Sequence, residues 1–256
     1  MTIQRRRIIE LALTFAAPVV LLAIWETLAR TETIDPRFWP APSSLIDTTA
    51  EIIRDGSLFR NVRVSLGRIL AGFLLGAIPA IGLGLTMGLF WPIRVFLMPL
   101  AAAIYAVPKL AIVPLVLIAF GTGEVANYVI VALSIFFLVL LNTVAGVIAI
   151  ESSFRDVARS FGAGPLSMFW TVALPGALPS IFTGLRLGMG FALVVIVGTE
   201  FIAARDGIGR FIWDSYQILA IKKMFVGLIV TGLMGWLLTL ALDLIERLAI
   251  PWNHGH

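Results

Sequence analysis

A few polar side chains lie inside long apolar stretches of this sequence, and their chemistry needs explaining first. Lys109 follows Pro108 in the segment YAVPKLAIVPL, Asn142 lies in LLNT, and Glu200 lies in VGTEF near the end of another apolar run. An ionisable group inside an apolar span is costly, so such residues commonly mark a solute path or a structural ion pair. Pro108, Lys109, Asn142 and Glu200 are therefore candidates for the lining of a solute path.

Each of these residues also has a structural interpretation. Lys109 could pair with Glu200 or extend outward to the membrane surface, and Asn142 could bond a neighbouring helix. An ammonium group that faced a pore would instead attract an anion. Pro108 and Pro114 each remove a helical N–H donor, which predicts that the helix around Lys109 is unwound or kinked.

Arg186, in TGLR, is a further charged residue inside an apolar stretch. It lies early in its span, where anchoring the preceding loop is its expected role. We expect no catalytic residue and no metal site, because the chain has no Cys, its two His are at the extreme C-terminus, and H-E-x-x-H and G-x-S-x-G are absent. The phosphate-binding pattern G-x-x-x-x-G-K-[ST] is absent as well, so the chain cannot bind ATP by a P-loop.

The elements that must position these residues are membrane helices. The chain is 256 residues long, 59% hydrophobic and only 13% charged, which excludes an ordinary soluble domain. The scattered basic residues give no basis for a nucleic-acid partner.

A retained span from 8 to 28 is favoured over a cleaved signal peptide, because the apolar run is long and no small-x-small site follows. Six stretches reach the roughly 20 residues that a membrane helix needs: Ile8–Leu28, Ile69–Phe90, Val95–Phe120, Val125–Ile150, Ile181–Ala204 and Met224–Leu248.

The charge pattern bears on orientation. Arg5, Arg6 and Arg7 precede the first span and favour a cytoplasmic N-terminus, since Lys and Arg gather on the cytoplasmic side. Over the whole chain, with Arg68 counted among the loop residues, the basic residues divide almost evenly between the two sides. The positive-inside rule therefore does not settle the orientation.

Glycines recur four residues apart within the predicted spans. The pairs are Gly72 and Gly76, Gly84 and Gly88, and Gly184 and Gly188. Such spacing allows two helix backbones to approach closely in lipid. Packing within the bundle is the favoured interpretation for any one pair, with dimerisation as the alternative.

The stretch from Ser160 to Leu185 has no charged residue, yet glycines and prolines interrupt it. Gly162, Gly164 and Pro165 predict the end of one helix and the start of the next. Leu166–Leu174 would make about two and a half turns, or roughly 14 Å, which is too short to cross a bilayer. We therefore expect a helix–turn–helix at the membrane surface that leads into the fifth span.

These residues form a recognisable pattern. Asp156-Val157-Ala158, three residues, Gly162, nine residues and Val172-Ala173-Leu174-Pro175 resemble the E-A-A-x3-G-x9-I-x-L-P loop of ABC importer permeases. Asp replaces Glu, and Val replaces Ala and Ile. Further segments, among them FWPAPSSL, LAIVPLVLIAFGTGE and RDGIGRFI, are similar to permeases of the nitrate/sulfonate/taurine/bicarbonate group from about Trp39 to the C-terminus.

The resemblance implies an all-α type I ABC importer permease (MetI-like) with six transmembrane helices and a cytoplasmic coupling helix in a loop at about 151–179. Residues 1–64 would form the first span and an external loop, and residues 65–256 a five-helix core. Both termini would be cytoplasmic, in a bacterial inner membrane. The implied ATPase-coupling residues are Asp156, Val157, Ala158, Arg159, Phe161, Gly162, Leu174 and Pro175.

The implied partners are separate ATPase subunits that carry ATP and Mg²⁺, a second permease copy, and a periplasmic or lipid-anchored solute-binding protein, all in or at membrane lipid. Gly188 and Gly190 would let the fifth spans of two copies approach. The chain itself would be no enzyme and hold no cofactor. The solute would be a small anion such as nitrate, a sulfonate, taurine or bicarbonate. The alternative from another class is a stand-alone channel or scaffold that needs no ATPase.

Overall fold

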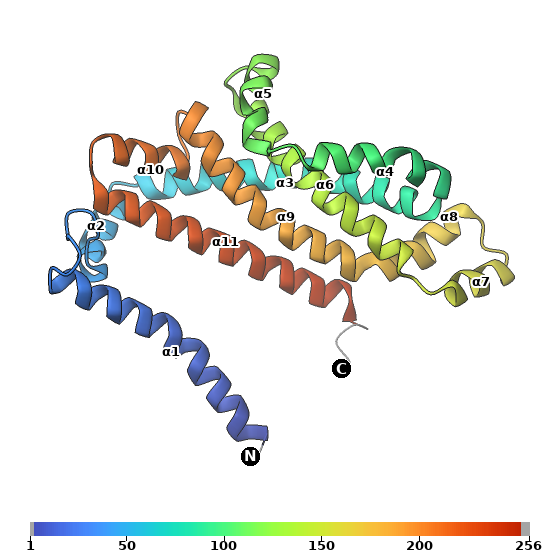
Figure 1. Cartoon of the computed structure of the whole chain (residues 1–256), viewed down its shortest axis with the longest axis horizontal. Helices are drawn as coiled ribbons and strands as arrows, with labels where there is room; N and C mark the ends of the chain where they lie inside the picture. The colour runs from blue at the N-terminus through green and yellow to red at the C-terminus, as the bar shows by residue number, and fades with distance from the viewer. Residues whose placement is uncertain (1–2, 252–256) are drawn as a thin grey trace. The chain divides into compact units, whose positions relative to one another are not determined.

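The computed structural model of the chain describes residues 3–251, with the side chains of residues 3–12, 14 and 15 excepted. Within that range every regular element is a helix, as the composition predicts (Figure 1). The chain divides into two compact units, which are described separately. One comprises Met1–Arg60 with Phe211–Ile229, and the other comprises Asn61–Arg210 with Val230–His256.

The first unit contains α1 (Ile3–Arg30), α2 (Pro42–Arg54), most of α10 (Ile208–Gln217) and the start of α11 (Ile221–Ala249). Aromatic and polar contacts join these elements. The ring of Phe225 lies 5.5 Å from that of Trp25 and 5.9 Å from that of Trp39. The carboxylate of Glu26 accepts hydrogen bonds from the backbone N–H and hydroxyl of Ser43, at 2.9 and 2.6 Å. The end of α1 is thereby tied to the start of α2.

The second unit is the helical core. It contains most of α3 (Ser57–Leu89), then α4 (Trp91–Tyr105), the 3-10 turn η1 (Lys109–Ile112), α5 (Val113–Phe120), α6 (Glu124–Ile148) and α7 (Ser152–Ser160). It continues with α8 (Pro165–Met168), the π-turn η2 (Phe169–Ala173), α9 (Leu174–Ala203) and the rest of α11.

Four helical runs in the described residues are long and apolar enough to cross a membrane. They are α3, α6, α11 and the 39-residue run Pro165–Ala203, and α4 with η1–α5 makes a fifth if that bent pair is one span. The predicted spans at 69–90, 125–150, 181–204 and 224–248 are confirmed in position. α1 is a 28-residue helix that includes the predicted span at 8–28. The total of six spans stays a prediction.

The predicted span at 95–120 is broken, as its prolines suggest. α4 ends at Tyr105, and the following helical segment leaves at 86°. Pro108 lies at the break, which confirms the predicted kink. Pro114 does not kink the chain, because it lies in the first turn of α5, where a helix has no N–H bond to lose.

The prediction of a separate short helix at Leu166–Leu174 is wrong. α8, η2 and α9 follow one another without a break, and Pro179 lies inside α9. The π-turn at Phe169–Ala173 directly precedes Pro175 and widens the helix locally, so the proline is accommodated there without ending the helix.

α6 lies at the centre of the core and is buried along most of its length. α3 packs against it through glycines: a Cβ built on Gly76 would lie 2.5 Å from the carbonyl oxygen of Ala132, and one on Gly88 would lie 2.4 Å from Cβ of Val147. Gly72 and Gly84 meet α6 in the same way. Packing inside the bundle is therefore confirmed for both glycine pairs of α3.

Candidate functional site

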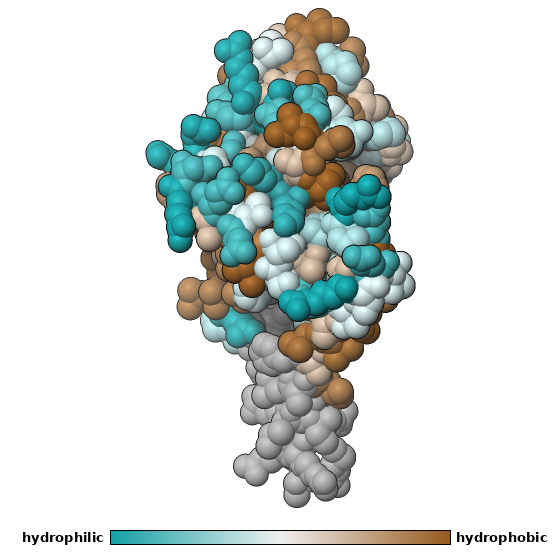
Figure 2. Space-filling view, turned by 90° about the vertical axis from the view of Figure 1, so that its left-hand side faces the viewer, coloured by the Kyte–Doolittle hydropathy of each residue, from teal (hydrophilic) through white to brown (hydrophobic). Residues whose placement is uncertain are grey.

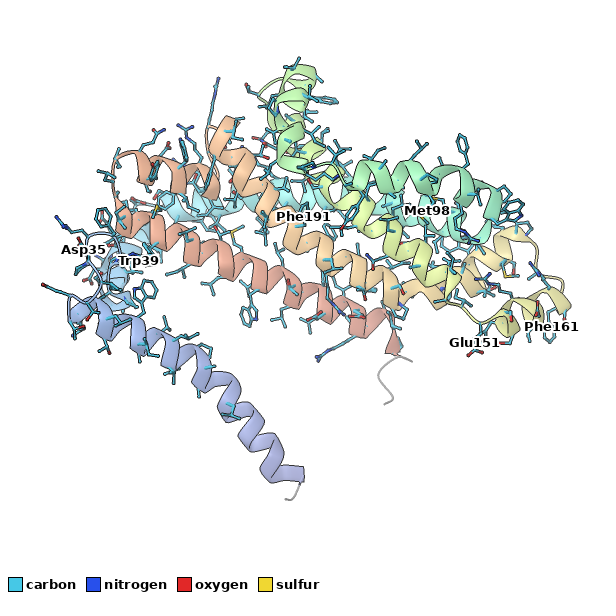
Figure 3. The ribbon with its side chains drawn as sticks, in the orientation of Figure 1. Asp35, Trp39, Met98, Glu151, Phe161 and Phe191 are labelled. Carbon is cyan, nitrogen blue, oxygen red and sulfur yellow. The ribbon has the colours of Figure 1, made fainter. Side chains whose placement is uncertain are left out.

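A cavity of about 670 Å³ lies beside the break between α4 and η1. Its wall carries two cations and no carboxylate. Phe191, labelled in Figure 3, belongs to the part of the wall that α9 supplies. The lining residues are Tyr105, Ala106, Val107, Pro108, Lys109, Ser134, Leu138, Arg186, Leu187, Gly190, Phe191 and Val194.

Lys109 is buried at the break, with 6% of its surface exposed. Its ammonium donates to the carbonyl oxygens of Ile104, Tyr105 and Val107 at 2.7, 3.2 and 2.9 Å. The last carbonyls of a helix have no intrahelical donor, and Lys109 supplies one to the end of α4. The ammonium also lies 5.5 Å from the centre of the Phe137 ring.

No carboxylate within the described residues forms an ion pair with Lys109. The alternatives of a pair with Glu200 and of an outward-extended side chain are therefore both wrong. Lys109 is a buried cation whose charge is met only by carbonyl dipoles and aromatic faces, beside an open cavity. Such a group attracts an anion.

Arg186 has a different environment. Its guanidinium pairs with Asp243, at 2.7 Å, and with Glu246, both on α11. Its charge is thus balanced within the chain, and it joins α9 to α11 in place of the expected anchoring of the loop.

Two other predicted path residues, Asn142 and Glu200, do not line the cavity. The side-chain amide of Asn142 donates to the carbonyl of Leu138, 2.8 Å away on its own helix, and Asn142 packs against Gly184 of α9. Gly188 also faces α6, where its Cβ would lie 3.3 Å from Ile135. Gly190 has no neighbour within 4 Å of a built Cβ. The approach of two copies through Gly188 and Gly190 stays a prediction.

Glu200 is fully buried in a hydrogen-bonded ion pair. Its carboxylate accepts from the guanidinium of Arg68 at 2.9 Å, from the hydroxyl of Ser65 at 2.7 and 2.9 Å, and from the backbone N–H of Gly209 at 2.8 Å. These bonds occupy both carboxylate oxygens. Of the two roles suggested for Glu200, a structural ion pair or a place on the solute path, the structure favours the ion pair.

Arg68 is the centre of this cluster and was missed by the sequence analysis, which counted it among the loop residues. It is 3% exposed and also binds Glu124, at 2.5 Å, and Asp206, at 2.6 Å. The cluster joins α3, the start of α6, the end of α9 and the loop after it. One feature of the sequence could have identified this cluster. Arg68, Glu124 and Asp206 lie in the segments SLGR, TGE and RDGIG, and all three segments resemble the family.

The predicted coupling segment begins with α7, an amphipathic helix without a buried residue. Its apolar side chains face outward: Val157 is 57% exposed and Phe161, at the turn that follows, is 87% exposed. Asp156 and Arg159 are exposed as well, with 3.8 Å between their charged atoms, and Ala158 is partly buried. Figure 3 shows Phe161 at the outer end of this segment.

Gly162 ends α7 in a left-handed conformation, with φ of 78°. The N–H of Gly162 donates to the carbonyl of Arg159 at 2.9 Å, and the N–H of Ala163 donates to that of Ala158 at 3.0 Å. This bond pair defines a Schellman cap, which favours glycine because a Cβ is strained there. The glycine of the motif is therefore explained by helix geometry.

Leu174 and Pro175 occupy the inner end of the motif. Leu174 packs against the buried cluster that includes Val147 and Ala177, and Pro175 lines a cavity of about 470 Å³ at the base of α7. The guanidinium of Arg155 donates to the carbonyl of Val147 at the end of α6. The inner end of the motif, at Leu174, therefore anchors the segment to the core. The outer part, from Asp156 to Gly162, lies at the surface.

The comparison with protein families decides the identity of this bundle. Residues 72–253 match the model described as "Binding-protein-dependent transport system inner membrane component". The chain belongs to this family. As a member of it, the protein is a multi-pass membrane permease subunit, and the resemblance stated from its motifs is confirmed.

Similar chains extend over nearly all of the protein. The taurine transport system permease protein TauC of Escherichia coli (strain K12) is 34% identical, covering 96% of this chain and 91% of that one. The putative aliphatic sulfonates transport permease protein SsuC of Bacillus subtilis (strain 168) is 31% identical, covering 93% and 87%. The nitrate import permease protein NrtB of Leptolyngbya laminosa is 31% identical, covering 96% and 89%.

The fold of this family member also matches a solved structure. A chain of the inward-facing MetNI methionine ABC transporter superposes with a TM-score of 0.65 at 18% identity, covering 75% of this chain and 96% of that one. The predicted type I importer permease architecture is confirmed.

Proposed function

We propose that the protein is the transmembrane subunit of an ATP-driven importer for a small anion: nitrate, a sulfonate such as taurine, or bicarbonate. Two copies would form an alternating-access path in a bacterial inner membrane, with both termini in the cytoplasm. Separate ATPase subunits would bind ATP and Mg²⁺, and a solute-binding protein would deliver the solute. The relatives for taurine, sulfonates and nitrate support this class of solute.

The outward face of α7 and its turn is the observation that carries the proposal. Val157 and Phe161 are exposed, while Leu174 and Arg155 fix the segment to the core. A short rigid helix with apolar side chains suits docking in a groove of another protein. In the assembly this face would contact the ATPase and transmit its closure to the helices.

The cavity beside Lys109 supports the anion path. Pro108 frees backbone groups at the break, and Lys109 contributes a positive charge that no carboxylate balances among the described residues. Broken helices commonly form solute sites where their freed groups face a cavity. Asn142 and Glu200 would hold the surrounding helices in place without touching the solute.

The test uses the permease co-expressed with its ATPase subunits and reconstituted in vesicles. Phe161→Ala and Val157→Asp should strongly reduce both ATPase co-purification and solute-dependent ATP hydrolysis, because they remove or charge the docking face. Phe96→Ala is the matched control, since Phe96 is an aromatic residue that is 72% exposed on α4, outside the motif at 156–175. The Phe96→Ala variant should retain its ATPase subunits and solute-dependent ATP hydrolysis.

Two results would contradict the proposal at different points. If Phe161→Ala and Val157→Asp behave like Phe96→Ala, α7 is not the coupling element. If the unaltered protein neither retains an ATPase nor imports any of these solutes with ATP, the importer assignment is wrong and the channel or scaffold alternative takes its place.

A further inference from the structure

A small recess, of about 210 Å³, lies between α7 and the junction of α3 with α4. Leu89 and Phe90 at the junction form one side, Arg155 and Arg159 of α7 form another, and the turn from α7 into α8 completes it. All of these elements belong to the second unit. The recess is therefore lined by two cations, and no carboxylate within the described residues lines it.

The two arginines share one face of α7. They are four residues apart, so their side chains are neighbours on the helix surface. Val157 lies midway between them in sequence, does not line the recess and is exposed on the other side of the helix. α7 thus has an apolar face suited to protein docking and a cationic face toward the recess. A partner that covers the apolar face leaves the cationic face open.

Both arginines have hydrogen-bond donors to spare. The guanidinium of Arg155, which has five N–H donors, donates to the carbonyl of Val147, and no ion pair to Arg155 is formed in the part of the chain that the structure describes. Arg159 lies 3.8 Å from Asp156, and the two side chains are 72% and 68% exposed. Such an exposed pair is weak in water. The recess can therefore bind an anion that offers several oxygens.

The cations of the first unit are arranged differently. Figure 2 shows the face of the molecule that carries α2, where hydrophilic residues surround smaller apolar areas. In that unit Arg37 lies 2.7 Å from Asp35, and Lys223 lies 3.6 Å from Glu51. These cations have carboxylate partners in their own chain. The two arginines beside α8 are better placed to bind an anion from outside the chain.

The residues around the recess indicate where that anion comes from. Phe90 and Trp91 are 43% and 66% exposed, and they directly follow α3, which is long and apolar enough to cross a membrane. Exposed aromatic residues at the end of a membrane helix are typical of the membrane–water interface. The recess is therefore expected at the depth of the lipid headgroups, with the apolar side chains of Leu89 and Met168 in its wall.

We propose that this recess binds the phosphate headgroup of an anionic phospholipid through the guanidinium groups of Arg155 and Arg159, and that the bound lipid holds α7 against the α3–α4 junction. The planar fork of arginine matches the oxygens of a phosphate group. The binding site itself does not depend on the proposed function. Its effect on coupling rests on that function, which places α7 on the cytoplasmic side, where anionic lipids attract basic segments.

The first experiment measures lipid binding by the whole chain in detergent, by native mass spectrometry during titration with phosphatidylglycerol. Arg159→Gln should raise the apparent Kd about fivefold, the usual effect of one basic residue at a membrane surface. Arg159→Lys should retain most of the affinity because it keeps the charge. Arg247→Gln is the control and should leave the Kd unchanged, since Arg247 is an exposed arginine in the last turn of α11, outside the recess.

Arg155→Gln tests the other cation. It keeps an N–H donor for the carbonyl of Val147 and should also raise the Kd about fivefold. The thermal unfolding midpoint shows whether this variant is folded, and the exposed Arg159 provides the test if it is not. In vesicles of phosphatidylcholine, added phosphatidylglycerol should increase solute-dependent ATP hydrolysis by the unaltered complex, and Arg155→Gln should abolish this increase.

Three outcomes would overturn the inference. Equal Kd values for Arg159→Gln and Arg247→Gln would show a non-specific attraction of charges. Displacement of the lipid by inorganic phosphate at similar concentrations would assign the recess to free phosphate. Displacement by added ATPase subunits would assign it to the protein interface. Conversely, binding with the expected differences in a permease that retains no ATPase would support the lipid site and contradict only the proposed function.

Discussion

Gly162 and Gly164 lie two residues apart in the turn after α7, but their conformations differ. Gly162 has a φ of 78°, whereas Gly164 has a φ of −75°, which any residue adopts. A Cβ built on either glycine meets no atom within 4 Å. A Cβ at either position causes no steric clash, so a difference between substitutions at Gly162 and Gly164 would reflect backbone strain alone.

Gly162→Ala should destabilise the end of α7 by about 1 kcal/mol, since a left-handed conformation costs a non-glycine residue roughly that much. Hydrogen exchange of the α7 amides should become faster, and coupling to the ATPase should weaken. Gly164→Ala should change neither. Equal effects of the two substitutions would show that the Schellman cap does not explain the motif glycine.

Arg68 is the residue whose loss should cost the fold most. Arg68→Met leaves the fully buried carboxylate of Glu200 without its cation, and breaking a buried pair in this way typically costs 3–5 kcal/mol. Chemical unfolding of the purified protein measures this loss. Arg68→Met with Glu200→Met should recover part of it, because the double change removes the unpaired charge. No recovery in the double variant would contradict the assigned pairing.

These ion-pair partners could not be identified from one sequence. The fold brings together four residues from separate segments: Arg68, Glu124, Glu200 and Asp206. Each lies at the boundary of an apolar stretch, where a charged residue is equally expected to face water. Lys109 was recognised as unusual, but its backbone partners depend on the angle between α4 and η1. The motif at 156–175 was recognised because its residues are close in sequence.

At the scale of elements, α3 and α6 are held together by a seam of glycines. A Cβ on Gly76 would lie 2.5 Å from backbone of α6, whereas Gly82, on the same helix, has nothing within 4 Å. A Gly→Ala substitution at each of these two positions of α3 therefore distinguishes the effect of close helix packing from that of helix propensity.

Gly76→Ala should destabilise the bundle by about 1–3 kcal/mol, the usual cost of overpacking. Gly82→Ala should be neutral or stabilise the helix by up to about 1 kcal/mol, because alanine is the better helix former. Thermal unfolding in one detergent compares the two variants. A loss of stability in Gly82→Ala as large as that in Gly76→Ala would contradict the packing described for this seam.

Hydropathy predicts the position of most helices here because a bilayer imposes their length. Proline was less reliable as a signal. Pro108 breaks a helix, Pro114 begins one, and Pro179 lies inside one. The difference depends on which backbone donor each proline removes, and this is not visible in the sequence.

At the scale of the whole molecule, the charge of Lys109 should affect which solutes the assembly imports. Lys109→Gln keeps an N–H donor for the carbonyls of α4 but removes the charge. Uptake of anionic solutes should fall about tenfold, the lower range of what a charged cleft contributes to ion capture. Uptake assays in vesicles measure this, with ATPase co-purification as the control for folding.

Lys109→Arg should retain most of the uptake, because it keeps both the charge and the donors. If Lys109→Gln imports anions as well as the unaltered protein does, the charge is not part of the path. The capping of α4 would then be the full role of Lys109.

The uninterrupted helical run Pro165–Ala203 also has a mechanical consequence. Its 39 residues form a rod of about 58 Å at 1.5 Å per residue. Force applied near the turn after α7 would travel along hydrogen-bonded backbone, past the cavity wall at Phe191, to the clamp at Glu200. The π-turn at Phe169–Ala173 interrupts the regular α-helical bonds near the start of this run. A small rotation of the run at that point would displace its far end by a larger distance.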